Sequence, residues 1–117
     1  VIDDDKDVRE LLSRLLKDAG YRPIDARDGK EGLERTKDEP ALIILDLEMP
    51  RMDGFEFLDN YIKDVPEEKR APVLVFSGTD LTDVQEDLLK ERVVGLVKKD
   101  DVSMDNLSKM IQSIVKS

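Results

Sequence analysis

Two residue types that carry much of enzyme chemistry are missing from this 117-residue chain, which has neither cysteine nor histidine. The lack of cysteine excludes disulfides, thiolate catalysis and Cys-ligated metal, and it suits a reducing compartment. The lack of histidine excludes an imidazole general base, a Ser-His triad and a phosphohistidine within the chain itself. These absences remove whole classes of catalytic site from consideration.

Positive charge and long apolar runs are also scarce. Lys and Arg total 19 against 28 for Asp and Glu, a net charge of −9, so a surface for nucleic-acid backbone is not expected. A protein or a metal ion is the more plausible partner. No apolar run approaches the roughly 20 residues of a membrane span, and no signal peptide is visible. We therefore expect a cytoplasmic domain that makes no membrane contact, although its parent protein can itself be membrane-anchored.

The length fits a single domain over residues 1–117, long enough for a real core and too short for a second effector module. Val1 and Ile2 are followed at once by Asp3, as at the end of a strand whose beginning has been cut off. We expect the chain to be a piece of a longer protein, with the N-terminal part of strand one truncated.

The most informative stretch is the aliphatic run 42–45, which stops abruptly at Asp46. An apolar run this short, between Pro40 and a loop rich in Pro and Gly, is typical of a strand buried on both faces. Asp46 would then lie at the edge of a parallel α/β sheet where ligands bind. From this stretch alone, a carboxylate that merely ends the strand and caps the next turn is an equally good interpretation.

Strand and helix patterns alternate along the rest of the chain. Further strands are predicted at 1–2, 21–26, 73–76 and 93–97, and each is followed by an amphipathic helix. A (βα)5 pattern with right-handed crossovers predicts a flavodoxin-like α/β three-layer sandwich around a parallel five-stranded sheet. Pro23 cannot donate to a sheet ladder, so the second strand is an edge and the strand order 2-1-3-4-5 fits.

Helix boundaries and core faces follow from local signals. Gly20 is placed as the C-cap of the first helix, and Thr82 with Gln85 matches a capping box. In the helix after that box, we expect Leu89 to face the core together with the apolar residues Val84 and Leu88. Ser103 can cap the last helix.

This strand order brings five polar residues to one crevice. Asp3 and Asp4 leave the first strand beside Asp46, while Ser77 and Lys99 leave the fourth and fifth strands at the same edge. Each alone has an ordinary structural explanation, but the joint placement favours a functional site. Crowded carboxylates repel unless one is protonated or a hard cation binds, and Mg²⁺ takes such oxygen ligands.

These residue types suit phosphoryl transfer, which needs mainly positioning and charge neutralisation. Asp46 could attack a phosphoryl group as a carboxylate nucleophile, and Lys99 and Ser77 could bind its oxygens. Successive strand side chains point to opposite faces, so only one of Lys98 and Lys99 can reach the crevice.

The chain resembles a response-regulator receiver domain of bacterial two-component signalling, essentially from end to end. The motifs that carry the resemblance are Asp3-Asp4, the third-strand stretch 45–54 (Leu-Asp-Leu-Glu-Met-Pro-Arg-Met-Asp-Gly), the fourth-strand stretch 72–78 (Pro-Val-Leu-Val-Phe-Ser-Gly) and the fifth-strand Lys. By this resemblance the chain is a phosphoacceptor signalling switch. It would take its phosphoryl group from the phosphohistidine of a histidine kinase or a histidine phosphotransfer protein and act on an output protein or domain.

The resemblance also implies a role for each site residue. Asp46 is the phosphoacceptor, and Ser77 and Lys99 contact the phosphoryl group; counting from Gly95 selects Lys99 rather than Lys98. The metal, Mg²⁺, is held by Asp46, by Asp4 directly, by Asp3 through water, and by the backbone carbonyl of Glu48.

Three features depart from the common receiver pattern or refine it. Asp100 follows the active Lys where Pro is usual, although some receivers carry Lys-Asp at this place. Leu96 occupies the position of an aromatic switch residue, so output is expected to travel differently. The segment 77–82 and the lack of Gly-Ala before the fifth strand resemble receivers of hybrid sensor histidine kinases more than those of DNA-binding regulators.

Two other functions remain open at this point. The triplet Asp46-Leu47-Glu48 superficially resembles the Asp-x-Asp motif of a metal-dependent phosphohydrolase, but the chain has no room for the cap domain such enzymes usually have. A pseudo-receiver that only docks without phosphorylation is the second, and the complete polar set argues against it. We expect no enzyme activity beyond the chain's own phosphorylation and dephosphorylation.

Overall fold

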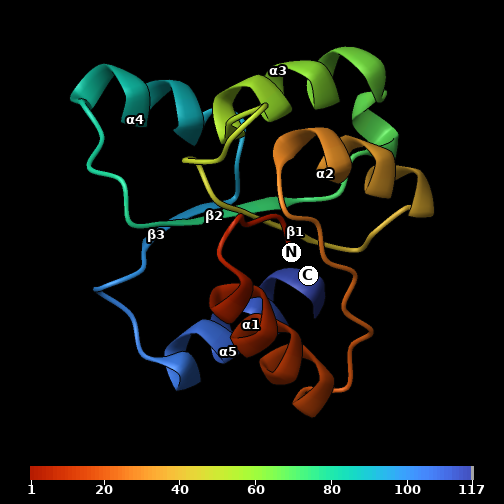
Figure 1. Cartoon of the computed structure of the whole chain (residues 1–117), viewed down its shortest axis with the longest axis vertical. Helices are drawn as coiled ribbons and strands as arrows, with labels where there is room; N and C mark the ends of the chain where they lie inside the picture. Colours follow the sequence, from red (N-terminus) through yellow and green to blue (C-terminus); the bar gives the residue numbers. More distant parts are fainter. Residues whose placement is uncertain (117) are drawn as a thin grey trace.

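The computed structural model describes residues 1–116 as a parallel sheet between two layers of helices (Figure 1). The strands are β1 (Ile43–Leu45), β2 (Val73–Ser77) and β3 (Gly95–Lys98). The helices are α1 (Lys6–Asp18), α2 (Gly29–Arg35), α3 (Gly54–Asp64), α4 (Asp83–Lys90) and α5 (Met104–Lys116), with short 3-10 turns η1 (Thr36–Asp38) and η2 (Glu67–Lys69). None of the helices within residues 1–116 combines the length and the apolarity needed to cross a membrane.

The sheet has the predicted order. β2 pairs in parallel with β1 on one side and with β3 on the other, with Ile44 opposite Leu74. Beyond β1, Ile2 forms single parallel bridges to Leu45 and to Ala26. From one edge of the sheet to the other, the segments are thus ordered Ala26 segment, Ile2 segment, β1, β2 and β3, which is the order 2-1-3-4-5.

The predicted strand at 21–26 contributes only one bridge, and proline chemistry explains the difference. Pro23 has no N–H to donate, so the segment cannot form a continuous ladder. The pairing is confined to the end of the segment. The Ile24 carbonyl accepts from the Val1 amine at 2.8 Å, the Ala26 N–H donates to the Val1 carbonyl at 2.8 Å, and the Ala26 carbonyl accepts from the Asp3 N–H at 3.0 Å. The edge strand is therefore corrected to a single bridge that fixes the backbone of Asp3.

Ile2 fixes the other side of the same junction. Its N–H donates to the Ile44 carbonyl at 2.8 Å, and its carbonyl accepts from the Asp46 N–H at 2.9 Å. Two chain segments 44 residues apart in sequence (2 and 46) are thereby locked in parallel. The residues that follow each of them must leave the sheet side by side.

The sheet separates two hydrophobic cores, because successive side chains of each strand face opposite layers. Ile43 and Leu45 of β1 face one layer and Ile44 the other. The first core adds Phe57, Leu58 and Tyr61 of α3 and Leu89 of α4. The second adds Leu12 and Leu16 of α1 and Leu107 and Ile111 of α5. The run 42–45 is thus a strand buried on both faces, as predicted.

The core face of α4 differs from the prediction. The Thr82–Gln85 capping box is present and Leu89 is 1% exposed, but Val84 and Leu88 are 69% and 53% exposed. Rows 84/88 and 85/89 each follow the spacing of four residues that defines one helix face, so periodicity alone cannot choose between them. The helix turns the second row toward the sheet, which leaves two aliphatic side chains in solvent.

Adjacent leucines on α4 offer a matched test of this orientation. Leu89→Ala should lower the free energy of unfolding by about 2–5 kcal/mol, because it opens a cavity in a packed core. Leu88→Ala should change it by less than about 0.5 kcal/mol, as is usual for a surface position. Urea unfolding of the two variants measures both values, and a larger loss for Leu88→Ala would show that the helix is rotated.

Candidate functional site

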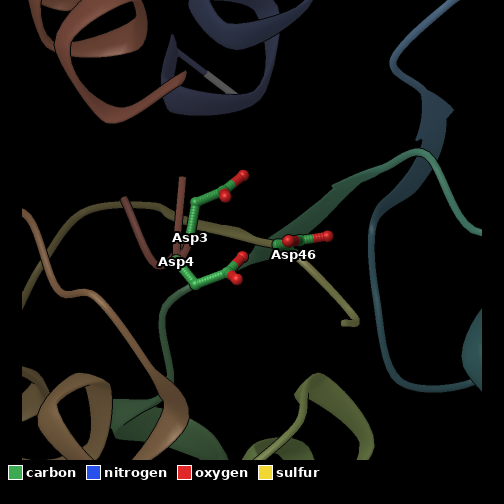
Figure 2. Close-up of side chains that lie close together, drawn as sticks. All are labelled: Asp3, Asp4 and Asp46. Carbon is green, nitrogen blue, oxygen red and sulfur yellow. The ribbon is translucent and has the colours of Figure 1, made fainter. Parts of the chain in front are cut away.

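Three carboxylates meet where the chain leaves Ile2 and β1 (Figure 2). Asp3 and Asp4 follow Ile2 and Asp46 follows β1, so the paired backbones described above carry them to the same edge of the sheet. One carboxylate oxygen from each lies within 4.8 Å of the others. Asp3 and Asp46 are buried, whereas Asp4 is exposed. The structure thus brings together the three acidic residues that the sequence placed here.

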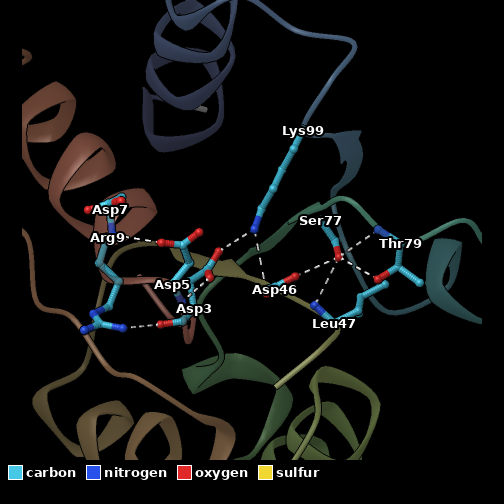
Figure 3. A network of polar contacts seen from close by, with 9 residues as sticks. All are labelled: Asp3, Asp5, Asp7, Arg9, Asp46, Leu47, Ser77, Thr79 and Lys99. Carbon is cyan, nitrogen blue, oxygen red and sulfur yellow. Dashed lines mark hydrogen bonds and ion pairs between the residues drawn. The ribbon is translucent and has the colours of Figure 1, made fainter. Parts of the chain in front are cut away.

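Lys99 enters this cluster from the end of β3. Its Nζ donates to Asp3 Oδ2 at 2.8 Å and lies 3.7 Å from Asp46 Oδ2 (Figure 3). Lys98, the last residue of β3, pairs with Asp80 at the surface instead. The alternation of side chains along an extended strand separates the two lysines. The prediction that Lys99 approaches Asp46 and Lys98 does not is confirmed.

Ser77, at the end of β2, holds the other oxygen of Asp46. Its hydroxyl donates to Asp46 Oδ1 at 2.7 Å (Figure 3). The same Oγ lies 3.4 Å from the backbone nitrogens of Leu47 and Thr79 and 3.1 Å from Thr79 Oγ1. Sequence reasoning assigned no role to Thr79. A hydroxyl residue two positions beyond a strand end that faces the site was the signal that could have found it.

The electrostatics of the cluster follow from burial and crowding. Burial raises the pKa of Asp46 and the charge of Asp3 raises it further, which outweighs the opposing hydrogen bond from Ser77 and the charge of Lys99. For Lys99, burial acts to lower the pKa, but the hydrogen bond to Asp3 and the charges of Asp3 and Asp46 raise it above its usual value. The site therefore holds a firmly protonated amine beside carboxylates that repel one another.

An open cavity of about 510 Å³ lies over these groups. Asp4, Asp46, Ser77 and Lys99 line it, and so do Glu48, Met49 and Thr79 from the two neighbouring loops. Carboxylate oxygens facing a water-accessible space are the donors that hard divalent cations take, and they require no nitrogen or sulfur ligand. The three carboxylates could therefore hold a metal ion. Glu48 borders the cavity, and the role of its carbonyl stays a prediction.

Leu96 and Ser77 border a second cavity of about 380 Å³. Thr79 and Asp80 of the loop after β2 and Lys98 of β3 also line this cavity. That output travels differently in this chain stays a prediction.

A parallel three-layer sandwich with carboxylates, a hydroxyl and an amine at successive strand ends defines a receiver-type α/β domain. The chain belongs to the response regulator receiver domain family, whose family model matches residues 1–112. Among solved structures, the chemotaxis protein CheY4 of Vibrio cholerae is similar, with a TM-score of 0.80 and 28% identity over 97% of this chain and 93% of that one. The receiver domain of the Francisella response regulator 1452 has a TM-score of 0.83 and 27% identity, covering 98% and 93% of the two chains.

Curated relatives agree with the family and show its range of contexts. Response regulator RR06 of Streptococcus pneumoniae is 42% identical over 79 residues, which is 67% of this chain and 35% of the relative. A protein-glutamate methylesterase/protein-glutamine glutaminase of Archaeoglobus fulgidus is 34% identical over 99% of this chain and 33% of its own. The chain spans about a third of the length of these relatives. It is a receiver domain, the phosphoacceptor switch of two-component response regulators.

Proposed function

We propose that Asp46 is the phosphoacceptor of this receiver domain and that its phosphorylation requires Mg²⁺. One observation carries the proposal: the Asp46 carboxylate lies between a hydroxyl donor on one oxygen, Ser77, and an ammonium on the other side, Lys99. Phosphoryl transfer asks a protein for this arrangement, because charge on the phosphoryl oxygens must be neutralised while the nucleophile is held in place.

The reaction balances with the groups present. An oxygen of Asp46 forms the new bond to phosphorus as the phosphorus–nitrogen bond of a partner's phosphohistidine breaks, and the imidazole nitrogen keeps the electron pair. The chain contains no histidine, so the phosphohistidine must come from another domain or protein. Lys99 offsets the charge that gathers on one phosphoryl oxygen, and the Ser77 hydroxyl turns from Asp46 toward another.

The carboxylates at the site fit the requirement for a bound Mg²⁺ ion. Asp4 and Asp46 would hold Mg²⁺ directly, with Asp3 through a water and Glu48 through its backbone carbonyl. When bound, the ion supplies positive charge to a phosphoryl oxygen. Asp3 already has Lys99 as a partner at 2.8 Å, which supports an indirect role for this carboxylate.

The partners follow from the family. Receiver domains accept phosphoryl groups from histidine kinases and connect to output domains; for this chain we propose a kinase or a histidine phosphotransfer protein as donor. The receiver of a hybrid sensor histidine kinase is one context that the sequence of segment 77–82 suggests. The domain would catalyse only its own modification, unlike the phosphohydrolase alternative.

A small phosphodonor tests this function without a partner. Acetyl phosphate with Mg²⁺ should add one phosphoryl group to the domain, and chelation of the metal with EDTA should prevent the addition. Intact-protein mass spectrometry measures the product, while acetate release reports turnover. Steady acetate release that continues fast and without accumulated phosphoprotein would favour the phosphohydrolase, and no addition at all would favour the pseudo-receiver.

Asp4→Ala tests the metal ligands. At a Mg²⁺ concentration of a hundred times Kd, wild type should gain about 2.7 kcal/mol of stability by mass action. Asp4→Ala should gain much less, and without metal it should be no less stable than wild type because carboxylate repulsion is relieved. Thermal unfolding with and without Mg²⁺ gives both values.

Asp7→Asn is the matched control, because it removes an exposed carboxylate of α1 that lies outside the cluster. Its gain in stability from Mg²⁺ should equal that of wild type. Equal gains for wild type and Asp4→Ala would count against Asp4 as a ligand.

A further inference from the structure

A buried carboxylate lies outside the cluster of Asp3, Asp4 and Asp46. Asp28, at the start of α2, is only 3% exposed. Its Oδ1 accepts the Glu31 N–H at 2.9 Å and so caps the helix. A helix cap does not require burial, and a buried charge is costly unless it is paired. The second oxygen of Asp28 must therefore have a partner that offsets the free-energy cost of burying the charge.

That partner is Arg51, which lies in the loop between β1 and α3. Arg51 Nε and Nη2 both donate to Asp28 Oδ2, at 2.8 and 2.5 Å. Burial acts to raise the pKa of Asp28, but the hydrogen bond from the Glu31 N–H and then the hydrogen bonds and charge of Arg51 outweigh it, so the pKa is lowered. Arg51 itself has a φ of +65°, a left-handed conformation that few residues with a side chain adopt. The ion pair thus holds the loop in a conformation that the backbone alone disfavours.

Backbone contacts add to this connection. The Gly29 N–H donates to the Met52 carbonyl at 3.1 Å, next to the ion pair. A Cβ atom at Gly29 would lie 2.5 Å from that same oxygen, so only glycine permits the approach. The start of α2 therefore contacts the loop in two ways: the Asp28 side chain pairs with Arg51, and the Gly29 backbone binds the Met52 carbonyl.

The other end of the loop is closed separately. The Gly54 N–H donates to the Leu47 carbonyl at 3.0 Å, which brings the two ends of the loop 47–54 together. Between these two anchors lie Glu48 and Met49, and both line the cavity over Asp46. Two contacts thus fix the loop segment that borders the site. The hydrogen bond between Gly54 and Leu47 closes the ends of the loop, and the ion pair of Arg51 with Asp28 connects the loop to α2.

We propose that Arg51 and Asp28 are positioning residues for the metal site, acting through the loop that carries Glu48. The proposal rests on the proposed function, because it takes the Glu48 carbonyl as a metal ligand. Groups that orient a metal's ligands commonly change its affinity by tenfold or more when they are removed. Loss of the Arg51–Asp28 pair should therefore weaken Mg²⁺ binding about tenfold.

Electrostatics alone predicts the opposite change in Mg²⁺ affinity, so the two explanations can be told apart. Arg51→Ala removes a positive charge from the neighbourhood of a cation site, so charge alone would strengthen Mg²⁺ binding. Weaker binding in Arg51→Ala can then come only from the altered loop. Asp28→Asn lacks this property, since loss of its negative charge would weaken cation binding in either case.

The experiment is a Mg²⁺ titration followed by two-dimensional amide NMR, which gives Kd without depending on the stability of the domain. Arg92→Ala is the matched control, because it breaks an arginine–aspartate pair with Asp59, on α3, outside the site. We expect wild type and Arg92→Ala to bind equally and Arg51→Ala to bind about tenfold more weakly. Arg51→Ala that binds as tightly as wild type, or more tightly, would overturn the proposal.

Arg51→Lys is a second variant for the case in which Arg51→Ala does not fold. It keeps the charge but has a single nitrogen in place of the two that contact Asp28. We expect weaker Mg²⁺ binding than in wild type, and unchanged affinity would again overturn the proposal. Failure of wild type itself to bind Mg²⁺ would instead contradict the proposed function, so the two failures are distinguishable.

Discussion

Asp46→Asn should abolish phosphoryl addition from acetyl phosphate and leave the fold intact. An amide oxygen is not a nucleophile at neutral pH, yet Asn keeps the shape of the side chain and an oxygen that can accept from Ser77. Burial and the Asp3 charge already raise the pKa of Asp46, so a neutral side chain should cost no stability. Intact-protein mass spectrometry measures the addition, and circular dichroism checks the fold.

Asp59→Asn provides the control for this variant. Asp59 belongs to α3 and pairs with Arg92 at the surface, outside the cavity. It should accept a phosphoryl group at the wild-type level. Full addition to Asp46→Asn would show that another carboxylate or hydroxyl is the acceptor.

Lys99→Ala should slow phosphorylation by about a hundredfold, the usual effect of removing one preorganised group that stabilises developing charge. Lys98→Ala should slow it by less than about threefold, because an exposed ion pair contributes little. The difference follows from geometry: Lys99 Nζ lies 3.7 Å from Asp46 Oδ2, whereas Lys98 pairs with Asp80. Rates of phosphoprotein formation with acetyl phosphate measure both effects.

Stability must be measured beside these rates. Without Lys99, the buried carboxylates of Asp3 and Asp46 lose their shared cation, so Lys99→Ala should also be less stable without metal. Rates are therefore compared at a temperature where both variants are folded. A slower reaction for Lys98→Ala than for Lys99→Ala would contradict the assigned roles.

Much of the fold could be predicted because the strong signals are local. The run 42–45 has no polar residue, so it must be buried on both faces, and Pro23 confines its segment to an edge. The rotation of α4 could not be predicted, since Val84 and Leu88 offer the same spacing as Gln85 and Leu89. The choice between such rows depends on how the helix packs on the sheet, which is a property of the whole fold.

The residues of the candidate site that lie at the ends of strands could be predicted from the sequence. Asp3 follows the bridged Ile2, Asp46 follows β1, and Ser77 is the last residue of β2, so strand order alone brings them together. Contacts that depend on loop conformation were missed, among them those of Thr79 with Ser77 and of Arg51 with Asp28. No periodicity predicts that a residue such as Arg51 adopts a positive φ or that a helix-capping carboxylate is buried.

The most direct test of the central claim is to locate the phosphoryl group chemically. The domain is phosphorylated with acetyl phosphate and Mg²⁺, reduced with sodium borohydride, which converts an aspartyl phosphate to homoserine, and mapped by peptide mass spectrometry. We predict homoserine at position 46 and unmodified residues at 3 and 4. Homoserine at Asp3 or Asp4 with Asp46 unchanged, or a stable phosphate on Ser77, would contradict the account.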